Sequence, residues 1–260
     1  MYPEISSLTL IALACAAFFA GFVDAIAGGG GLIQLPALLI GLPKTETVMI
    51  LGTNKVPSIF GTSAAAINYR RNIKSDPKLL LVMAIPAFLG SMGGATLASS
   101  IPTEALKPIV VILLICVAYY TWRRPTLGAV ESLRHNPGRR FQIAALAALI
   151  IGFYDGIIGP GTGSFLILIL VAVLGFAFIN ASAIAKVVNV ATNLGAIIIF
   201  GFHGEILWKL GLTLAIANVL GAIVGSHLAI RGGSTLVRKV FLIVTVILIC
   251  KVGFDTVVNW

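Results

Sequence analysis

The sequence predicts an all-α integral membrane protein whose two halves are repeats of each other. Of its 260 residues, 58% are hydrophobic and only 10% are charged, which is too little polar surface to cover a soluble globule. Long apolar stretches recur along the whole chain, and the second half matches the first without a gap at an offset of 131 residues. These observations are typical of a membrane protein with internal repeats.

Eight apolar stretches are close to the ~20 residues that a helix needs to cross a bilayer. They are 8–27, 46–69, 78–98, 104–121, 141–158, 179–200, 207–230 and 236–257. Two shorter stretches, 32–42 and 163–176, follow glycine-rich breaks. The start of the chain lacks the basic region of a signal peptide, so we expect the first stretch to be retained. The cysteines lie in apolar segments and are expected to be small buried hydrophobes: Cys15, Cys116 and Cys250.

The repeat places the same unusual residues at the same position in each half. Asp24 corresponds to Asp155, Lys55 to Lys186, and the glycine run 28–31 to the run that begins at Gly159. We expect a first repeat at 1–121, a basic linker at 122–140 and a second repeat at 141–260. Hydrophobic segments that are broken at matching positions are typical of secondary transporters, and the breaks mark the binding site.

The charged loops predict how the chain lies in the membrane. Lysine and arginine concentrate at 70–78, 122–140 and 231–239, and short basic loops stay on the cytoplasmic side. These loops account for the net charge of +9 without a nucleic-acid partner. Loops at equivalent positions then fall on opposite sides, so we expect inverted halves and periplasmic termini. Inversion requires each half to contain a glycine-broken helical hairpin plus three spanning helices, a 5+5 arrangement of helical segments.

Each glycine break is a candidate anion site. The glycines release the chain from one helix, and a new helix begins near Leu32 or Ser164, so its free amides and positive dipole end point into the break. A tight apex without a ligand is the alternative. Gln34 and Ser164, about one turn or less into these helices, are neutral donors. The candidate backbone ligands are Gly28, Gly29, Gly30, Gly31, Gly159, Gly161 and Gly163.

Lys55 and Lys186 strengthen the anion hypothesis. A lysine inside a membrane span costs roughly 2.5–3.5 kcal/mol on insertion scales and usually faces a cavity or a partner on a transport pathway. Snorkelling of the side chain to the membrane surface is the alternative. Because both lysines recur at the same repeat position, two cations and two helix N-termini are expected to converge, which favours a small anionic substrate.

Polar residues close to each lysine are further candidate ligands. Asn54 and Ser58 lie beside Lys55, and Asn189 and Asn193 follow Lys186. Their amides and hydroxyls suit oxyanion oxygens, and buried hydrogen bonds between helices are the alternative role.

Asp24 and Asp155 directly precede the breaks. Three roles fit such carboxylates: counter-ions of the lysines, caps within the apex, or groups that couple transport to a proton gradient. No metal-ligand spacing occurs along the chain, so we expect neither a metal nor a cofactor.

The breaks and their surroundings resemble those of the TauE/SafE family of sulfite and organosulfonate exporters. The resemblance is carried by the run 21–32, by Thr53-Asn54-Lys55, and by the runs 152–156 and 159–164, and it covers essentially the full chain. It implies a carrier of small sulfur-containing anions, such as sulfite or sulfoacetate, in the bacterial cytoplasmic membrane. By motif match it also implies functional roles for the glycine apices and for Asp24, Lys55, Asp155 and Lys186.

The sequence therefore predicts a secondary transporter that exports a small anion by alternating access. A passive anion channel is the first alternative, because it would share the anion site. An intramembrane enzyme with Asp24 and Lys55 as acid and base is the second, but neither the repeat nor the lack of a nucleophile favours it. The expected partners are the small anion and the lipid bilayer, and the sequence leaves the oligomeric state open.

Overall fold

The described residues of the computed structural model, 6–98 and 128–258, form helices and contain no strand. The first half contributes α1 (Ser7–Ala27), α2 (Gly31–Gly41), α3 (Thr47–Asn72) and α4 (Pro77–Leu97). The second half contributes α6 (Pro137–Ile157), α7 (Thr162–Ala172), α8 (Phe178–Phe202) and α9 (Trp208–Val258). The all-helical prediction is confirmed. The predicted span 104–121, with Cys116, lies outside the described residues.

Five of these helices are long and apolar enough to cross a membrane: α1, α4, α6, α8 and α9 from Trp208 to Val244. Large hydrophobic side chains on them face outwards, among them Ile11, Leu81, Ile150 and Ile216, as expected of helices that contact lipid. The predicted span 46–69 does form the 26-residue helix α3. It is not one of the five, because its polar side chains lower its hydropathy.

The predicted loop 231–239 is wrong, because this segment is helical except at one residue. Gly233 has φ 60° and ψ −164°, and it divides α9 into two helical parts. A backbone with positive φ is readily adopted by glycine. The two parts correspond to the two apolar stretches 207–230 and 236–257. Both helices were therefore predicted from the sequence, but the connection between them is shorter than the predicted loop.

Helix starts follow local sequence signals. The side chains of Ser6, Asp76 and Asn136 cap α1, α4 and α6 by accepting hydrogen bonds from amides in the first turn. Pro77 and Pro137 then occupy the first helical position, where a missing N–H has no consequence.

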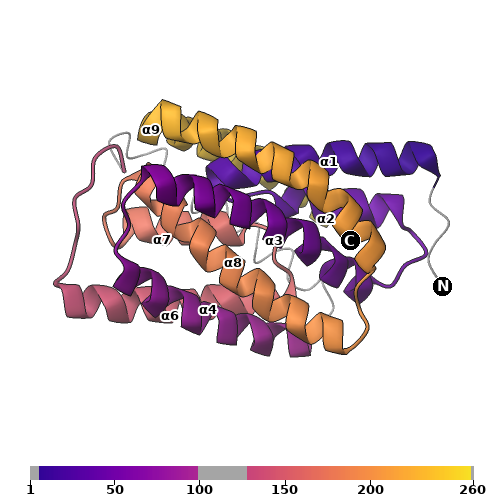
Figure 1. Ribbon diagram of the computed structural model, residues 1–260, viewed down its shortest axis with the longest axis horizontal. Coiled ribbons are helices and arrows are strands. Elements are labelled where there is room, and N and C mark those ends of the chain that lie inside the picture. The colour runs from indigo at the N-terminus through magenta and orange to yellow at the C-terminus, as the bar shows by residue number, and fades with distance from the viewer. Residues whose placement is uncertain (1–5, 99–127, 259–260) are drawn as a thin grey trace.

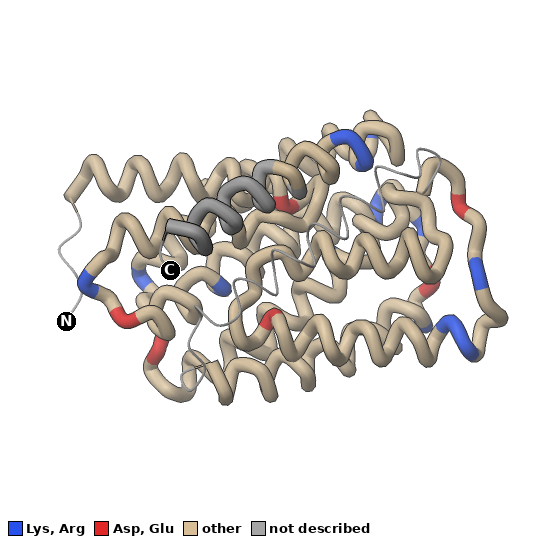
Figure 2. The backbone as a smooth tube through the Cα atoms, turned by 180° about the vertical axis from the view of Figure 1, so that it is seen from behind, with Lys and Arg blue, Asp and Glu red and all other residues tan. Residues whose placement is uncertain are grey.

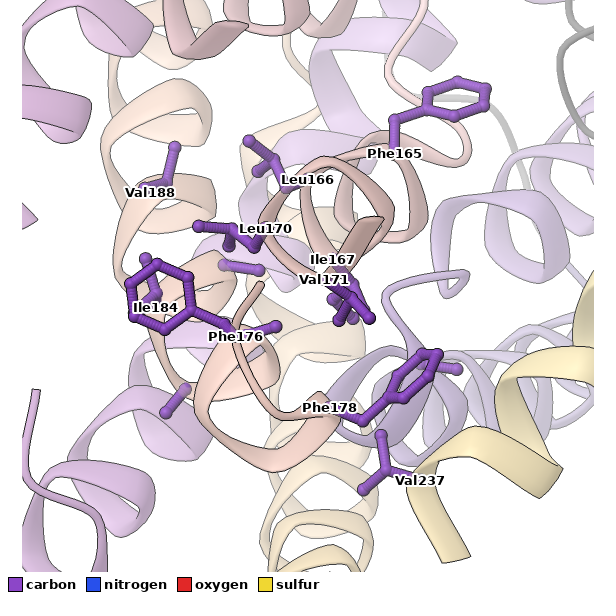
Figure 3. Close-up of a cluster of buried hydrophobic side chains, with 14 of the residues drawn as sticks. Phe165, Leu166, Ile167, Leu170, Val171, Phe176, Phe178, Ile184, Val188 and Val237 are labelled. Carbon is purple, nitrogen blue, oxygen red and sulfur yellow. The ribbon is translucent and has the colours of Figure 1, made fainter. Parts of the chain in front are cut away.

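The helices are arranged in layers (Figure 1). Helices α1 and α9 lie along one long edge of the molecule, α4 and α6 lie along the opposite edge, and α3 and α8 pass between them. The short helix α7 is buried in the interior. Its residues Phe165, Leu166 and Ile167 pack in a cluster that includes Ile184 and Val188 of α8 (Figure 3). A helix that ends inside the membrane region is tolerated where protein surrounds it.

The two edge pairs are built by glycines at equivalent positions. A Cβ atom added at Gly94 of α4 would lie 2.0 Å from the carbonyl oxygen of Phe153 in α6. A Cβ atom at Gly225 of α9 would lie 2.4 Å from the carbonyl oxygen of Phe22 in α1. Both residues of the first contact are 131 positions from their counterparts in the second. Each half therefore packs one of its helices against the first helix of the other half, with backbones in close approach.

Valine at Gly94 should destabilise the protein, because its side chain would overlap the backbone of α6. We expect Gly94→Val to lower the free energy of unfolding by about 1–3 kcal/mol or to prevent folding, measured as thermal stability in detergent. Gly93→Val is the matched control, because a Cβ atom there has its nearest neighbour at 3.8 Å. Equal stability of the two variants would contradict the close packing of α4 on α6.

Charged residues lie mainly at the two ends of the molecule (Figure 2). The basic segments 70–78 and 128–140 meet at one end, where the Lys78 ammonium lies 5.4 Å from the centre of the Phe141 ring. Segment 231–239 reaches the same end, because the Ser234 hydroxyl accepts a hydrogen bond from the Ile179 amide next to these loops. The start of α1 lies at the opposite end (Figure 1). The predicted basic loops thus share one face in their described parts.

Candidate functional site

The two glycine breaks lie in direct contact in the interior. Gly28 ends α1 with φ 77°, and Gly161 precedes α7 with φ 89°. A Cβ atom at Gly28 would lie 2.3 Å from the backbone of Gly163, so only a bare backbone fits there. Ser164 of α7 joins the breaks, because its amide donates to the Gly28 carbonyl at 3.2 Å and its hydroxyl to the Ala27 carbonyl at 2.8 Å.

Each buried lysine forms an ion pair with the aspartate of the other half. Lys55 Nζ lies 2.8 Å from Asp155 Oδ2, and Lys186 Nζ lies 2.8 Å from Asp24 Oδ2. Each ammonium also donates to the backbone carbonyl of the same aspartate, at 2.5 Å in both cases. The pairing is reciprocal, since an offset of 131 converts one pair into the other.

Both lysines are inside the protein, with exposures of 2% for Lys55 and 0% for Lys186. A buried charge whose partner is removed destabilises a fold by about 3–5 kcal/mol. Neither lysine therefore snorkels to the surface, and each depends on its aspartate for compensation.

A pocket lined mainly by polar residues and glycines, and partly open to the outside, lies between the breaks, with a cavity volume of about 30 Å³. Roughly 10–15 Å³ of such volume holds one water molecule, so the pocket has room for only a small molecule. Both halves contribute to it: the breaks from one side, and α3 and α8 from the other. The lining residues are Asp24, Gly28, Gly31, Asn54, Lys55, Ser58, Thr62, Asp155, Gly159, Gly161, Thr162, Gly163, Asn189 and Asn193.

Two asparagines in the pocket have unused hydrogen-bonding groups. Asn54 and Asn189 are 3% and 5% exposed, and their Oδ1 atoms are buried without a partner among the described residues. Their Nδ2 groups donate no hydrogen bond in the described part of the chain either. Buried amides normally have partners, so two unpartnered amides in one pocket indicate a place for a ligand or water.

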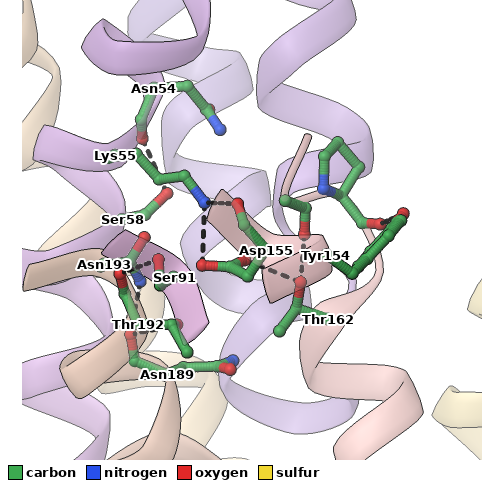
Figure 4. Close-up of polar contacts among 12 residues, drawn as sticks. Asn54, Lys55, Ser58, Ser91, Tyr154, Asp155, Thr162, Asn189, Thr192 and Asn193 are labelled. Atoms are coloured by element: carbon green, nitrogen blue, oxygen red, sulfur yellow. Dashed lines mark hydrogen bonds and ion pairs between the residues drawn. The ribbon is translucent and has the colours of Figure 1, made fainter. Parts of the chain in front are cut away.

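Lys55 lies at the centre of this arrangement (Figure 4). In the close-up, Asn54 and Asn189 lie on opposite sides of the Lys55–Asp155 pair. Thr162 donates to Asp155 Oδ1 at 2.7 Å, so both carboxylate oxygens are engaged. An ammonium has three N–H donors, and Lys55 uses two of them on Asp155. One donor of Lys55 is left for a bound molecule.

Five of the candidate ligands do not line this pocket: Gly29, Gly30, Gln34, Ser164 and Lys186. Gln34 instead accepts a hydrogen bond from Asn218 Nδ2 of α9 at 2.8 Å. Ser164 is occupied by the carbonyls of the first break, and Lys186 by Asp24. Lys186 uses two of its three N–H donors on Asp24, as Lys55 does on Asp155, and differs from Lys55 in not lining the pocket.

Two lining residues, Thr62 and Thr162, were missed by the sequence reasoning. The repeat contains the signal that finds them. Thr62 is equivalent to Asn193 and Thr162 to Gly31 at the offset of 131, and both counterparts were already candidates.

The arrangement suits a small anion better than a metal ion. Within the described residues, no group of three or more His, Cys, Asp or Glu side chains could hold a metal. The pocket offers an ammonium, two amides and hydroxyls, which are donors for oxyanion oxygens. The two ion pairs are neutral overall, so an anion would bring the only net charge of the site.

Comparisons with known proteins identify a family and several relatives of the chain. The model of the family described as sulfite exporter TauE/SafE matches residues 13–252. A Sinorhizobium protein described as "Probable membrane transporter protein ORF9" is 41% identical, over 92% of this chain and 90% of its own length. "Probable membrane transporter protein YfcA" of Escherichia coli K12 is 37% identical, over 97% and 92%.

A further relative, a "Probable membrane transporter protein" of Haemophilus influenzae, is 36% identical over 95% of both chains. No solved structure matches the chain. These relatives and the apolar helices identify a multi-pass membrane transporter. With the family model matching from the first helix to the last, the chain belongs to the TauE/SafE sulfite exporter family.

Proposed function

We propose that the protein exports a small oxyanion, such as sulfite or a sulfonate, across the bacterial cytoplasmic membrane by alternating access. The observation that carries the proposal is the pocket in which buried Lys55 lies beside Asn54 and Asn189, whose Nδ2 donors make no hydrogen bond within the described residues. The family description supports a sulfur-containing substrate. The small pocket volume supports a substrate of few atoms.

In this proposal the anion shares the ammonium of Lys55 with Asp155. An oxyanion oxygen takes the free N–H of Lys55, and the amides of Asn54 and Asn189 donate to the other oxygens. The pair Lys55–Asp155 compensates itself in the empty site, so a bound anion adds an unbalanced negative charge. Protonation of Asp155 would remove that imbalance, so a proton would move in the same direction as the anion and couple its transport to a proton gradient.

Alternating access follows from the proposed inverted relation of the halves. The reciprocal ion pairs and the reciprocal glycine contacts of α4 and α9 support a two-fold relation between them. The face that carries the basic segments is then cytoplasmic, and the termini are periplasmic. The two halves rock against each other around the breaks and expose the pocket to either side.

An anion panel tests the substrate class on the purified protein. We expect sulfite and methanesulfonate to raise the thermal stability, by about 2.7 kcal/mol at a hundredfold excess over Kd. Acetate and chloride should stabilise the protein less, because they offer fewer oxygens to the pocket. Equal effects of all anions, or no effect of any, would contradict an oxyanion site.

Counterflow in proteoliposomes then distinguishes a carrier from a channel. Unlabelled sulfite inside the vesicles should drive transient uptake of labelled sulfite against its gradient, which a passive channel cannot produce. Chemical analysis of the recovered anion separates transport from an intramembrane reaction.

A further inference from the structure

Three side chains from α3 and α8 donate hydrogen bonds to three consecutive backbone carbonyls at the end of α1. Lys186 Nζ donates to the Asp24 carbonyl. The hydroxyl of Tyr69 in α3 donates to the Ala25 carbonyl at 2.9 Å, and that of Ser182 in α8 donates to the Ile26 carbonyl at 3.3 Å. Both hydroxyl residues are fully buried. Carbonyls at a helix end lack partners within the helix, so these bonds hold the first break in place.

The second break lacks the equivalent hydroxyl donors. At the offset of 131, Tyr69 corresponds to Phe200 and Ser182 to Leu51, and neither side chain can donate a hydrogen bond. The lysine of the first break does have a counterpart, because Lys55 donates a hydrogen bond to the backbone carbonyl of Asp155. Among the described residues, no side chain donates to the carbonyl of Gly156 or Ile157. The two breaks therefore differ in their hydrogen-bond donors, and this difference is present in the sequence as well as in the structure.

The helix after each break shows the same difference. Gln34 of α2 accepts a hydrogen bond from Asn218 of α9 at 2.8 Å. The equivalent positions hold Phe165 in α7 and Ala87 in α4. Apolar contacts have no directional bond to break and permit small sliding movements of packed helices. Both hairpins share the lysine–aspartate contact, but within the described residues the other polar bonds that hold α1–α2 to α3, α8 and α9 have no equivalent at α6–α7.

We propose that the two breaks have different roles: α1–α2 is the fixed wall of the site, and α6–α7 is the part that moves during transport. Tyr69 and Ser182 are positioning residues that keep the first break rigid. Ser164 links the moving part to the fixed part, because its two hydrogen bonds connect α7 directly to the first break. This inference rests on the proposed transport function for its purpose, but the difference in rigidity can be measured without a substrate.

Hydrogen–deuterium exchange of the full chain in nanodiscs tests the proposal. In the ligand-free protein, amides in 155–165 should exchange about tenfold faster than those in 24–34, because fewer bonds resist opening. Sulfite should slow exchange in 155–165 and leave 24–34 unchanged. Equal ligand-free rates in the two segments would overturn the proposal. A rate difference without any response to sulfite would retain it and contradict only the proposed substrate.

Matched variants test the positioning residues. Tyr69→Phe and Ser182→Ala should each raise exchange in 24–34 by about tenfold and leave 155–165 unchanged. Tyr154→Phe is the control, because the Tyr154 hydroxyl donates to Pro160 within the second break at 2.6 Å. Its effect should be confined to 155–165. Uniform changes in both segments would indicate general loosening and would overturn the assignment.

Phe200→Tyr places a hydroxyl at the position in the second half that is equivalent to Tyr69. We expect counterflow of sulfite to slow about tenfold with unchanged equilibrium binding, because a new bond holds the moving break. Unchanged counterflow together with unchanged exchange in 155–165 would count against a mobile second break. If this variant does not fold, the exchange rates of the wild-type protein still decide the proposal.

Discussion

Removing the Lys55–Asp155 pair should strongly weaken oxyanion binding in a protein that still folds. Lys55→Met alone would strand the buried carboxylate of Asp155, at a cost of about 3–5 kcal/mol. The double variant Lys55→Met/Asp155→Asn removes both charges and avoids that cost. A charged hydrogen bond contributes about 1.5–3 kcal/mol, so the affinity for sulfite should fall about 100-fold, measured by calorimetry.

The equivalent double substitution in the other ion pair is the matched comparison. Asp24 lines the pocket but Lys186 does not, so Lys186→Met/Asp24→Asn removes no cation from the pocket and should lower the affinity by less than about tenfold. Folding of both double variants is checked by gel filtration before binding is measured. Equal losses of affinity would mean that the lysines act as a symmetric pair. No loss in either variant would make both lysines structural.

Much of the site follows from the sequence because the repeat identifies it. Two lysines at one repeat position are improbable as accidents of composition, and burial of both is what an intramembrane cation requires. The glycine breaks likewise predict the ends of α1 and α6. The observed starts of α2 and α7, at Gly31 and Thr162, are within two residues of the predicted ones.

The partners within the site do not follow from the sequence. Lys55 and Asp155 are 100 positions apart, and the pattern offers pairing within a half as readily as pairing between halves. Gln34 shows the same limit, because its distance from the helix start suggests a role in the break. Its amide is instead taken by Asn218 on α9, a contact that depends on how α9 crosses α1 and α3.

Asparagine variants of Asp155 and Asp24 distinguish the roles of the two carboxylates most clearly. Asp155→Asn retains a group that can accept the Thr162 hydrogen bond but leaves Lys55 without a negative partner. The empty protein should lose about 3–5 kcal/mol of stability from the unpaired ammonium. Because Lys55 faces the pocket, sulfite can replace the lost carboxylate. We therefore expect sulfite to stabilise Asp155→Asn more than it stabilises the wild-type protein, measured as the shift in melting temperature.

Asp24→Asn is the matched control, because it leaves Lys186 unpaired outside the pocket. It should show a comparable loss of stability that sulfite does not restore. Rescue of both variants by sulfite would contradict the assignment of Lys55 as the substrate cation.

Transport by Asp155→Asn gives the second half of this test. An amide cannot take up and release a proton at physiological pH, and a site that binds the anion too tightly releases it slowly. Sulfite transport driven by an imposed proton gradient should therefore be lost, while exchange of sulfite across the vesicle membrane should persist at a reduced rate. If gradient-driven transport persists in Asp155→Asn, the carboxylate is only a counter-ion, and the coupling group must be sought elsewhere along the pathway.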